Sequence, residues 1–569
     1  MNEKLTMDRR RFLGLGALSA VTAATMGVAG CAPASPSTSS AGEQADTSPQ
    51  AGYSFEVAPD PIAENDISET MEADVVIVGA GPSGLVTGMS CVEQGLKVIV
   101  FSSSEAPVAR GGSNAAIFSK KMEELGLPRV DADPFLRSQI ADYSFNVDTR
   151  KWYTWYNNSE ESMNWLIDVM ADTGTVLTIE QGNGYEDQAD PSFAPMASHC
   201  WNDEEHPVVA DGQPVVVKAL AEKIQAAGSQ VLFQVTAQQL VRGGTPNGTE
   251  GRVNAVIGQN ANGEYIKFVG TKAVVLATGD FSTDREMMEK YCPNAVELIS
   301  NWEHESNPDV GKVYGGLYTG QGQKMGLWVG AAWQKAWPNC YMAGVFGTPS
   351  DMPYNVHGGL LVDGDGRRFV NEQMGSGNFG QMYRHVKGGQ AYAIMDCTYP
   401  EQHQPWWKSK MAYGEDSLSP EEVIAGWDEQ VEKGSMWKAD TLEELIDTMG
   451  LPATTIDTVE TYNGYCETGV DAEYHKRPGL LTAIKTPPFY GAATMEKPIF
   501  LTVLGGLRTD DNMRVCNEDD EPIEGLYNVG SMVGDTFAGN YNFLIEGHNH
   551  GMNCVTFGYL TGRFIAENE

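Results

Sequence analysis

Three glycines, Gly79, Gly81 and Gly84, have the spacing that binding of a dinucleotide phosphate requires. In such a motif the first glycine allows a tight turn, the second lets the backbone approach a pyrophosphate, and the third allows the following helix to pack closely. Ser83 lies inside the same motif. The free N–H groups at the start of that helix would face the phosphates. These residues therefore predict a dinucleotide site.

The flanking segments have the pattern needed to position this motif. An apolar run, Ala73–Val78, precedes it, a helical segment follows, and a second apolar run ends at Phe101. The order strand, helix, strand is typical of a dinucleotide-binding βαβ unit. An acidic residue usually follows the second strand and accepts the ribose hydroxyls, but this chain has Ser102 there. We expect Ser102 to take that role, with Glu105 as the alternative.

The composition limits both the class of protein and its partners. The chain has 569 residues, of which 41% are hydrophobic and 63 are glycine, enough for two folded units with separate cores. The formal net charge is −38. Nucleic acid and anionic membrane surfaces would repel such a chain, so neither is an expected partner.

The first residues predict export. Residues 1–30 combine a basic start, an apolar segment and a run of small residues, which is typical of a signal peptide. Asp8–Leu13 resembles the twin-arginine signal of proteins exported already folded, and Val28–Cys31 resembles a lipobox. We therefore expect a lipid on Cys31, a flexible tether over 31–70, and a location at the outer face of the cytoplasmic membrane. The alternatives are a retained membrane helix, and cleavage followed by release.

The cysteines give no sign of a metal site. The chain has nine of them, and no two are arranged as Cys-x-x-Cys. This argues against a zinc site, a ferredoxin-type cluster or a c-type haem, although disulfides between distant cysteines stay open. Electrons would therefore need a separate carrier.

Five segments, in order, resemble the flavoprotein subunits of fumarate reductase and succinate dehydrogenase. That family also contains urocanate reductases, ketosteroid dehydrogenases and a cardiac-glycoside reductase. The segments are the glycine motif, then Arg110–Ala116, Lys272–Phe281, Thr319–Gly326, and Gly505–Leu507 together with Gly525–Ser531. The resemblance implies FAD as the cofactor. Because Arg110–Ala116 contains no histidine, it also implies that the flavin is bound non-covalently.

The resemblance further implies a fold and a set of cofactor contacts. The fold would be α/β, with a Rossmann-like FAD-binding domain split into 71–334 and 499–569 and an inserted α+β capping domain at 335–498. Asp535 would compensate for the acidic residue that Ser531 replaces. The implied contacts beyond the first motif are Gly111, Gly112, Ser113, Asn114, Ala115, Thr278, Gly279, Gly530, Ser531, Asp535 and, just before the predicted last helix, Asn549.

The family's substrate-binding cations are missing from the matching positions. Arg368–Glu372 matches the family's RFxNE segment, but the proton-donating arginine expected four residues later is Ser376. Trp337 replaces the histidine of a His-Pro pair, and 539–553 contains no arginine where the last clamp is expected. A dicarboxylate would be buried here without partners. We therefore expect a neutral or singly charged, bulky substrate beside Trp337, Glu372 and Ser376.

Tyrosine would suit such an uncharged site as the proton donor. The candidates are Tyr541, in the loop that lacks the clamp arginine, and Tyr341, beside the replaced His-Pro pair. Packing is the alternative role for either tyrosine. His357 and Arg384 are weaker catalytic candidates, because a histidine before two glycines is more often a loop residue and a lone arginine a surface cation.

The predicted function is an exported FAD-dependent reductase. Hydride would move from reduced flavin to an activated C=C bond of this neutral or singly charged, bulky organic acceptor. Electrons would come from a separate cytochrome or a membrane quinol-linked donor. Two alternatives stay open: a ketosteroid-type dehydrogenase working in the oxidative direction, and a non-catalytic flavin lipoprotein that only relays electrons.

Overall fold

The computed structural model describes residues 52–129, 131–180, 197–209, 211–296, 318–340, 342–346, 359–373, 379–403, 418–499, 502–539, 541–542 and 544–569. The chain divides into the units Met1–Gly52 and Tyr53–Glu569, and nearly all described residues belong to the second. Within these ranges, no helix combines the length and the apolar character needed to cross a bilayer. The predicted export signal and Cys31 lie outside the described residues.

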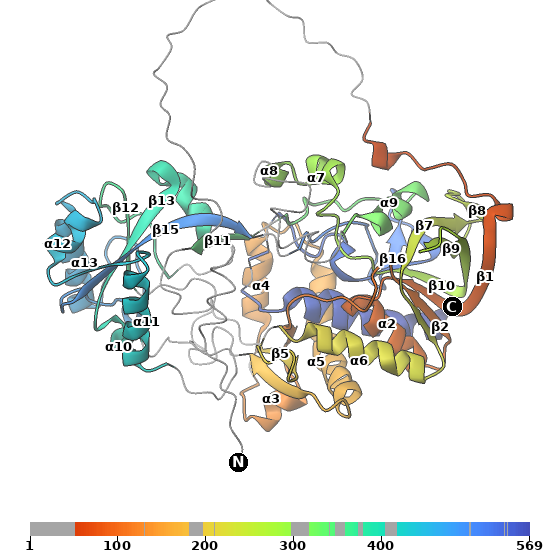
Figure 1. The fold of residues 1–569 in the computed structure, drawn as a ribbon, viewed down its shortest axis with the longest axis horizontal. Coiled ribbons are helices and arrows are strands. Elements are labelled where there is room, and N and C mark those ends of the chain that lie inside the picture. The colour runs from red at the N-terminus through yellow and green to blue at the C-terminus, as the bar shows by residue number, and fades with distance from the viewer. Residues whose placement is uncertain are drawn as a thin grey trace, which may run out of the picture. The chain divides into compact units, whose positions relative to one another are not determined.

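The glycine motif directly follows β1, which is a strand of a nine-stranded mixed sheet (Figure 1). Its order is β6-β2-β1-β10-β9-β7-β8, and β17 pairs with both β10 and β16. The centre is parallel, from β6 through β2 and β1 to β10 and on to β17, whereas β9 and β7 are antiparallel. The strands are β1 (Ile67–Val78), β2 (Val98–Phe101), β6 (Gln230–Leu232), β7 (Val235–Arg242), β8 (Thr245–Pro246), β9 (Val253–Asn260), β10 (Tyr265–Leu276), β16 (Arg514–Cys516) and β17 (Pro522–Asn528).

Helices cover the parallel part of this sheet. Residues 75–78 of β1 are all buried, which is the pattern of a parallel strand between two layers. The last helix, α14 (Phe557–Asn568), packs on α2 (Pro82–Glu93), the helix of the glycine motif. Gly562 permits this approach, because a Cβ there would lie 2.6 Å from the Cβ of Ser90. The predicted α/β fold is confirmed, with both ends of the described chain contributing to one sheet-and-helix layer.

A small antiparallel sheet has the order β3-β5-β4. Its strands are β3 (Asn114–Ala116), β4 (Val176–Glu180) and β5 (Ala197–Asn202). Helix α5 (Thr149–Met170) and a π-helix, His550–Thr556, both contact β3. The predicted flavin segment at 110–116 therefore runs into a strand that the start of the last helix supports.

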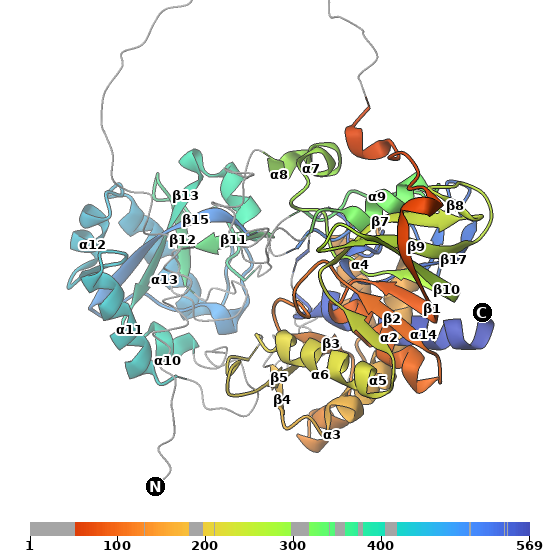
Figure 2. The same cartoon turned by 45° about the vertical axis from the view of Figure 1, so that its right-hand side comes forward.

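A five-stranded antiparallel sheet has the order β11-β15-β13-β12, with β14 beside β15 (Figure 2). Because side chains alternate between the faces of a strand, Leu361 of β12 packs with Trp427 of α11, whereas Leu360 and Val362 pack with Leu445 of α12. Helices thus cover both faces. The elements are β11 (Met342–Phe346), β12 (Leu360–Asp363), β13 (Gln390–Asp396), β14 (Trp437–Ala439), β15 (Phe489–Ile499), α11 (Pro420–Glu432), α12 (Leu442–Thr448) and α13 (Thr455–Thr468).

The strands of the five-stranded sheet all lie within Met342–Ile499. The domain boundaries at 334/335 and 498/499 stay predictions. The other helices of the described chain are α3 (Lys120–Glu124), α4 (Asp133–Asp142), α6 (Gln213–Ala226), α7 (Arg285–Tyr291), α8 (Pro293–Val296), α9 (Gln321–Trp328) and α10 (Tyr399–His403), with short 3-10 turns between elements.

Candidate functional site

The turn between β1 and α2 has room only for glycine at its close approaches. Gly79 has φ +119°, and a Cβ there would lie 2.1 Å from the carbonyl oxygen of Ala277. A Cβ on Gly84 would lie 2.1 Å from the carbonyl oxygen of Gly79, and one on Gly530 would lie 2.4 Å from Ser83 Oγ. Any side chain at these positions would force backbone or a buried hydroxyl aside. The spacing seen in the sequence thus has a steric cause.

The start of α2 faces open space. Gly81 is its N-cap and Pro82 its first residue, and no side-chain hydrogen bond caps the helix start. A Cβ on Gly81 would have only the carbonyl oxygen of Val108 near it, at 3.6 Å. Free N–H groups and the positive end of a helix dipole attract phosphate. This helix start can therefore take a pyrophosphate.

A cavity of about 710 Å³ opens at this helix start. Its walls come from the glycine turn, the end of β2, the segment before β3 and the loop before the last helix. This volume lies in the range of small-molecule and cofactor sites in proteins. The predicted cofactor residues on its walls are Gly79, Gly81, Ser83, Ser102, Gly111, Gly112, Ser113, Thr278, Gly279, Ser531 and Asn549. Volume, phosphate-binding turn and polar wall together fit FAD.

Hydroxyl groups line the cavity where β2 ends. Ser102 and Ser104 both lie on the wall, and their Oγ atoms are 2.8 Å apart. The Ser104 hydroxyl donates to the carbonyl oxygen of Ala106 at 2.7 Å, so in the Ser102–Ser104 contact the Ser102 hydroxyl is the donor. An oxygen lone pair of Ser102 is left to accept a ribose O–H. The alternative, Glu105, is exposed and is not part of the described wall.

Two predicted cofactor residues lie behind the wall. The side-chain amide of Asn114 is fully buried and donates to the carbonyl oxygen of His199 at 3.0 Å. The N–H of Ala115 donates to the carbonyl oxygen of Gly547 at 3.1 Å, which ties β3 to the loop before the last helix. Both residues hold the wall together through backbone contacts.

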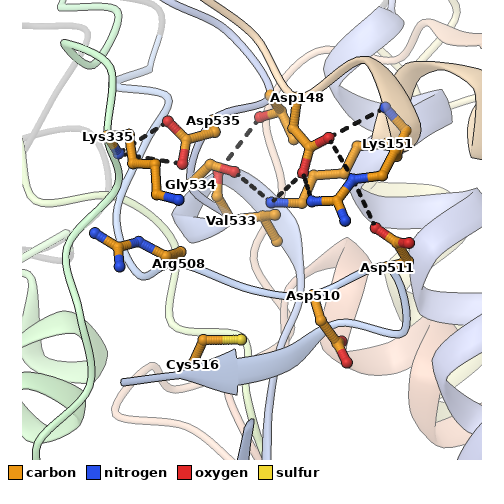
Figure 3. A network of polar contacts seen from close by, with 12 residues as sticks. Asp148, Lys151, Lys335, Arg508, Asp510, Asp511, Cys516, Val533, Gly534 and Asp535 are labelled. Carbon is orange, nitrogen blue, oxygen red and sulfur yellow. Dashed lines mark hydrogen bonds and ion pairs between the residues drawn. The ribbon is translucent and has the colours of Figure 1, made fainter. Parts of the chain in front are cut away.

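Asp535 does not lie on the described wall, where a flavin contact was expected. Its carboxylate accepts the N–H of Lys335 at 3.0 Å (Figure 3). It also accepts the N–H of Ala336 at 2.9 Å. Beside it, the buried Lys151 ammonium donates to the carbonyl oxygen of Gly534 at 2.8 Å (Figure 3). Backbone donors satisfy this carboxylate, so its role is to fix the loop after Ser531 rather than to replace the missing acidic flavin contact.

Asp280, where glycine is usual, organises one end of the cavity. Its side chain is buried, and it accepts from the Thr502 hydroxyl at 2.9 Å and from the N–H of Val503 at 3.0 Å. Arg110, on the cavity wall, places a guanidinium nitrogen 3.6 Å from the same carboxylate oxygen. The positive charge of Arg110 is therefore balanced inside the protein. The resemblance covered Asp280 within Lys272–Phe281 and Arg110 within Arg110–Ala116, but it did not predict that Arg110 and Thr502 line the cavity.

Tyr541 lies on the cavity wall, as the proton-donor hypothesis requires. The side chain is buried, and its hydroxyl oxygen accepts the N–H of Asn549 at 3.2 Å. Burial raises the pKa of Tyr541 above the ordinary tyrosine value, so the hydroxyl stays protonated at neutral pH. A protonated hydroxyl that already accepts from backbone can still donate its own hydrogen.

The last helix begins as a π-helix, His550–Thr556, a wider turn that the sequence prediction of a helix after Asn549 did not include. Such wider turns occur frequently at functional sites. His550 lies on the cavity wall, and its Nδ1 is 3.1 Å from the carbonyl oxygen of Ser113. Burial lowers the pKa of His550 to about 4, so the ring is neutral at pH 7 and Nδ1 is assigned as the donor.

The structure brings few of the other predicted site residues to this cavity. Tyr341, His357 and Ser376 lie outside the described residues. Arg384 is exposed in a 3-10 turn. Trp337 is 67% exposed, so it is a surface side chain rather than a buried pocket wall.

Glu372 lies in a buried ion network rather than at a surface that a substrate can reach. Its carboxylate accepts from Arg368 at 2.8 and 2.9 Å and lies 3.3 Å from the Lys476 ammonium. Arg368 also lies 2.9 Å from Asp471. Both oxygens of Glu372 thus contact buried cations. The charged pair Arg368 and Glu372 therefore stabilises the region of the five-stranded sheet. The RFxNE match located the segment, but it could not reveal partners 100 positions away.

The mixed sheet has a parallel centre, and a glycine turn and an open helix start face a cofactor-sized cavity. These features are typical of a dinucleotide-binding flavoprotein. Residues 74–543 match the family model described as FAD binding domain, and the chain belongs to that family. FAD is the cofactor, and the protein is an FAD-dependent oxidoreductase. The predicted membership in the fumarate reductase and succinate dehydrogenase flavoprotein superfamily is confirmed.

Known relatives cover both directions of flavin chemistry. Vinyl phenol reductase of Lactiplantibacillus plantarum is 23% identical over 521 residues, 86% of this chain and 94% of the relative. A 3-oxosteroid 1-dehydrogenase of Mycolicibacterium smegmatis is 30% identical, over 52% of each protein, so the chain matches about half of that relative. The crystal structure of 3-ketosteroid-delta4-(5alpha)-dehydrogenase from Rhodococcus jostii RHA1 has a TM-score of 0.63 at 23% identity, covering 89% of this chain and 99% of that one.

Proposed function

We propose that this protein is an FAD-dependent reductase of an activated C=C bond in a neutral or singly charged, bulky organic acceptor. The observation that carries the proposal is the lack of arginine and lysine at the positions that match the family's substrate clamps, at Trp337 and in 539–553, together with the charge of the cavity wall that FAD and the acceptor would share. Among its described residues, Arg110 is the one with a positive charge at neutral pH, and Asp280 already balances it. A dicarboxylate would lose hydration here without gaining cationic partners, at a cost of several kcal/mol.

The wall residues can handle the proton of such a reaction. FAD supplies the hydride when it is bound in its reduced form. Tyr541 keeps its hydroxyl hydrogen at neutral pH and would donate it to a carbonyl or to the carbon next to the one that receives hydride. Its hydrogen bond from the Asn549 N–H holds the hydroxyl at the wall.

The relatives' names cover both kinds of acceptor. One relative is named for a vinyl phenol and another for a 3-oxosteroid, whereas two others are named for fumarate, a dicarboxylate, so support for an uncharged acceptor comes from this chain's own residues. The steroid relative also favours a second candidate, a dehydrogenase that works in the oxidative direction with the same wall residues.

The proposed reductase would work outside the cytoplasm. The twin-arginine and lipobox patterns at 8–13 and 28–31 support export and a lipid on Cys31. The protein would then sit at the outer face of the cytoplasmic membrane and take electrons from a separate cytochrome or a quinol-linked donor.

The test uses FAD-loaded protein reduced anaerobically with a viologen dye. Reoxidation of the flavin is followed after adding a vinyl phenol, a cinnamate, a steroid enone, urocanate or fumarate. We expect the vinyl phenol or the enone to reoxidise the flavin and fumarate not to do so. Reoxidation by fumarate alone contradicts the proposal, and a flavin that only steroid substrates reduce would favour the dehydrogenase.

A further inference from the structure

Two carboxyl groups are buried directly behind the cavity wall. Glu180 ends β4 and is 1% exposed, and Glu546 lies in the loop before the last helix and is 6% exposed. Acidic side chains are rarely buried to this extent unless they are paired. Binding of FAD does not account for either residue, because neither is on the described wall of the cavity.

The small sheet brings the two carboxyls together. Glu180 of β4 pairs with Ser198 of β5, and Ser198 pairs with Ala115 of β3, so the three residues form one row across the sheet. The Ser198 hydroxyl donates to the backbone carbonyl oxygen of Glu546. The N–H of Ala115 donates to the carbonyl oxygen of Gly547 at 3.1 Å. The row therefore holds the backbone of the loop at Glu546 against the sheet, and the charge of Glu180 reaches the Glu546 carboxyl.

A hydroxyl connects this pair to the cavity. Ser113 Oγ lies 2.5 Å from an oxygen of Glu180, and Ser113 is itself a wall residue. On its other side, the carbonyl oxygen of Ser113 accepts from His550 Nδ1 at 3.1 Å. A serine hydroxyl can accept one hydrogen bond and donate another by rotating. Ser113 can thus face either Glu180 or the cavity.

The surroundings keep protons on the pair. Among the described residues, the polar groups that contact Glu180 are the Ser113 hydroxyl and, at 4.0 Å, the Cys200 thiol, and both are uncharged. Both carboxyl oxygens of Glu546 are buried without a hydrogen-bond partner in the described structure. Burial raises the pKa of Glu180 to about 7, and burial followed by the charge of Glu180 raises the pKa of Glu546.

The pair titrates as a unit. The charge of Glu180 raises the pKa of Glu546, so ionisation of Glu180 favours keeping the proton on Glu546. Arg110 and His550 are the nearby wall groups that could respond, but Arg110 is paired with Asp280 and His550 is neutral. The exchangeable proton therefore belongs to the two glutamates.

We propose that Glu180 and Glu546 form a proton store for the flavin cavity, with the Ser113 hydroxyl as the positioning group that passes the proton on. The inference deepens the proposed reductase and rests on it for its physiological use. Reduction of a C=C bond consumes one proton for every hydride transferred, and the store would replace the proton that Tyr541 donates.

The relay conserves atoms and charge. The Ser113 hydroxyl gives its proton to the proton-accepting atom in the cavity, and its oxygen takes the proton of Glu180. One O–H bond breaks on Ser113 and one forms, while the pair changes from two protons to one shared proton. Water outside the protein restores the lost proton before the next reaction.

The store is tested without any acceptor. Infrared spectra of the full-length FAD-loaded protein, taken across the pH range, should show a carboxylic acid band that falls with a midpoint near pH 7. Glu180→Gln should remove that titration. Glu160→Gln is the matched control, because Glu160 is at the surface and pairs with Arg129 at 2.6 Å, and it should leave the band unchanged. A wild-type spectrum without a titrating acid band overturns the store.

The relay is tested by the midpoint potential of bound FAD, measured against dyes as a function of pH. We expect a break in this plot near pH 7, and we expect Ser113→Ala to remove the break while the infrared titration persists with its midpoint moved to higher pH, because the Ser113 hydroxyl lowers the pKa of Glu180. A break that persists in Ser113→Ala overturns the relay. If Glu180→Gln does not retain FAD, the Ser113→Ala pair of measurements decides. Neither measurement needs a substrate, so failure of the store is distinguishable from failure of the reductase proposal.

Discussion

Buried charge is distributed differently in the two sheet regions of this protein. The five-stranded sheet buries two acids and two cations together, Arg368, Glu372, Asp471 and Lys476. The cavity beside the nine-stranded sheet has one described cation on its wall, Arg110, and that cation is balanced by Asp280. The comparison separates charge that holds the fold from charge that could hold a ligand.

The difference explains why the RFxNE segment is retained without a clamp beyond it. Arg368 and Glu372 lie four positions apart in the sequence and hydrogen-bond to each other. They also contact Asp471 and Lys476, which follow α13 in the chain. A set of two positive and two negative groups is internally neutral. Such a network needs no substrate to satisfy it, so keeping it implies nothing about a charged ligand.

The largest expected effect comes from Gly79→Ala, which acts on the cavity side of the comparison. The new Cβ would meet the Ala277 carbonyl oxygen at 2.1 Å at a residue with φ +119°, so the turn cannot keep its form. We expect purified protein without flavin absorbance. Gly95→Ala is the control, because Gly95 also has a positive φ but has no atom within 4 Å of its Cβ. Retention of FAD by Gly79→Ala would contradict the steric account.

Glu372→Ala tests the buried ion network in the region of the five-stranded sheet. It leaves the buried cations Arg368 and Lys476 without their acid, which should cost about 3–5 kcal/mol of unfolding free energy. Asp365→Ala, at an exposed acid that pairs with Arg367, should cost about 0–1 kcal/mol. Urea unfolding midpoints measure both. Equal midpoints for the two variants would mean that the network does not stabilise the fold.

Tyr541→Phe tests whether Tyr541 donates the proton at the cavity wall. Losing a general acid typically lowers the rate by about 10²–10⁴-fold, and FAD absorbance should stay unchanged because the ring still fills its site. Tyr143→Phe is the matched control, since Tyr143 is buried and accepts from the N–H of Asn542 at 3.4 Å but is not on the described wall. Anaerobic reoxidation of the reduced flavin gives the rates. Equal slowing in both variants would point to packing rather than proton donation.

A smaller loss of folding stability is expected when the pH is lowered. His548 is buried among Trp152, Trp155 and Phe537, and burial lowers its pKa to about 3. The unfolded chain binds this proton near pH 6.5 and the folded chain does not, so stability falls as the pH drops from about 6.5 toward 3.

His548→Phe should reduce this acid loss by about 1–3 kcal/mol, measured as the pH dependence of thermal unfolding. His206→Gln, at a partly exposed histidine beside Asp203, is the control. An unchanged slope in His548→Phe would show that another group causes the acid loss.

The sequence predicted the cavity better than it predicted the roles of charged residues. Gly79, Gly84 and the βαβ order could be predicted because a steric requirement fixes residue type and local spacing together. Tyr541 was placed by its position in a loop that the resemblance identified. These are features that short stretches of sequence carry by themselves.

The remaining site residues depend on contacts between distant segments. Glu372 was expected beside a substrate, but Asp471 and Lys476 determine its role, and they lie about 100 positions away. Asp535 was expected beside FAD, but its carboxylate meets the backbone of Lys335 instead. No local pattern shows such pairings, because a carboxylate looks the same whether it faces a cofactor or a loop.

The central claim is that the cavity favours an uncharged acceptor, and a matched pair of acceptors tests it most directly. Fumarate and its dimethyl ester share one C=C bond and differ in charge. The account predicts that dimethyl fumarate reoxidises the dye-reduced, FAD-loaded protein at least about 100-fold faster than fumarate, which corresponds to roughly 2.7 kcal/mol. Faster reoxidation by fumarate would contradict the account, because it would require cationic partners that the described wall does not provide.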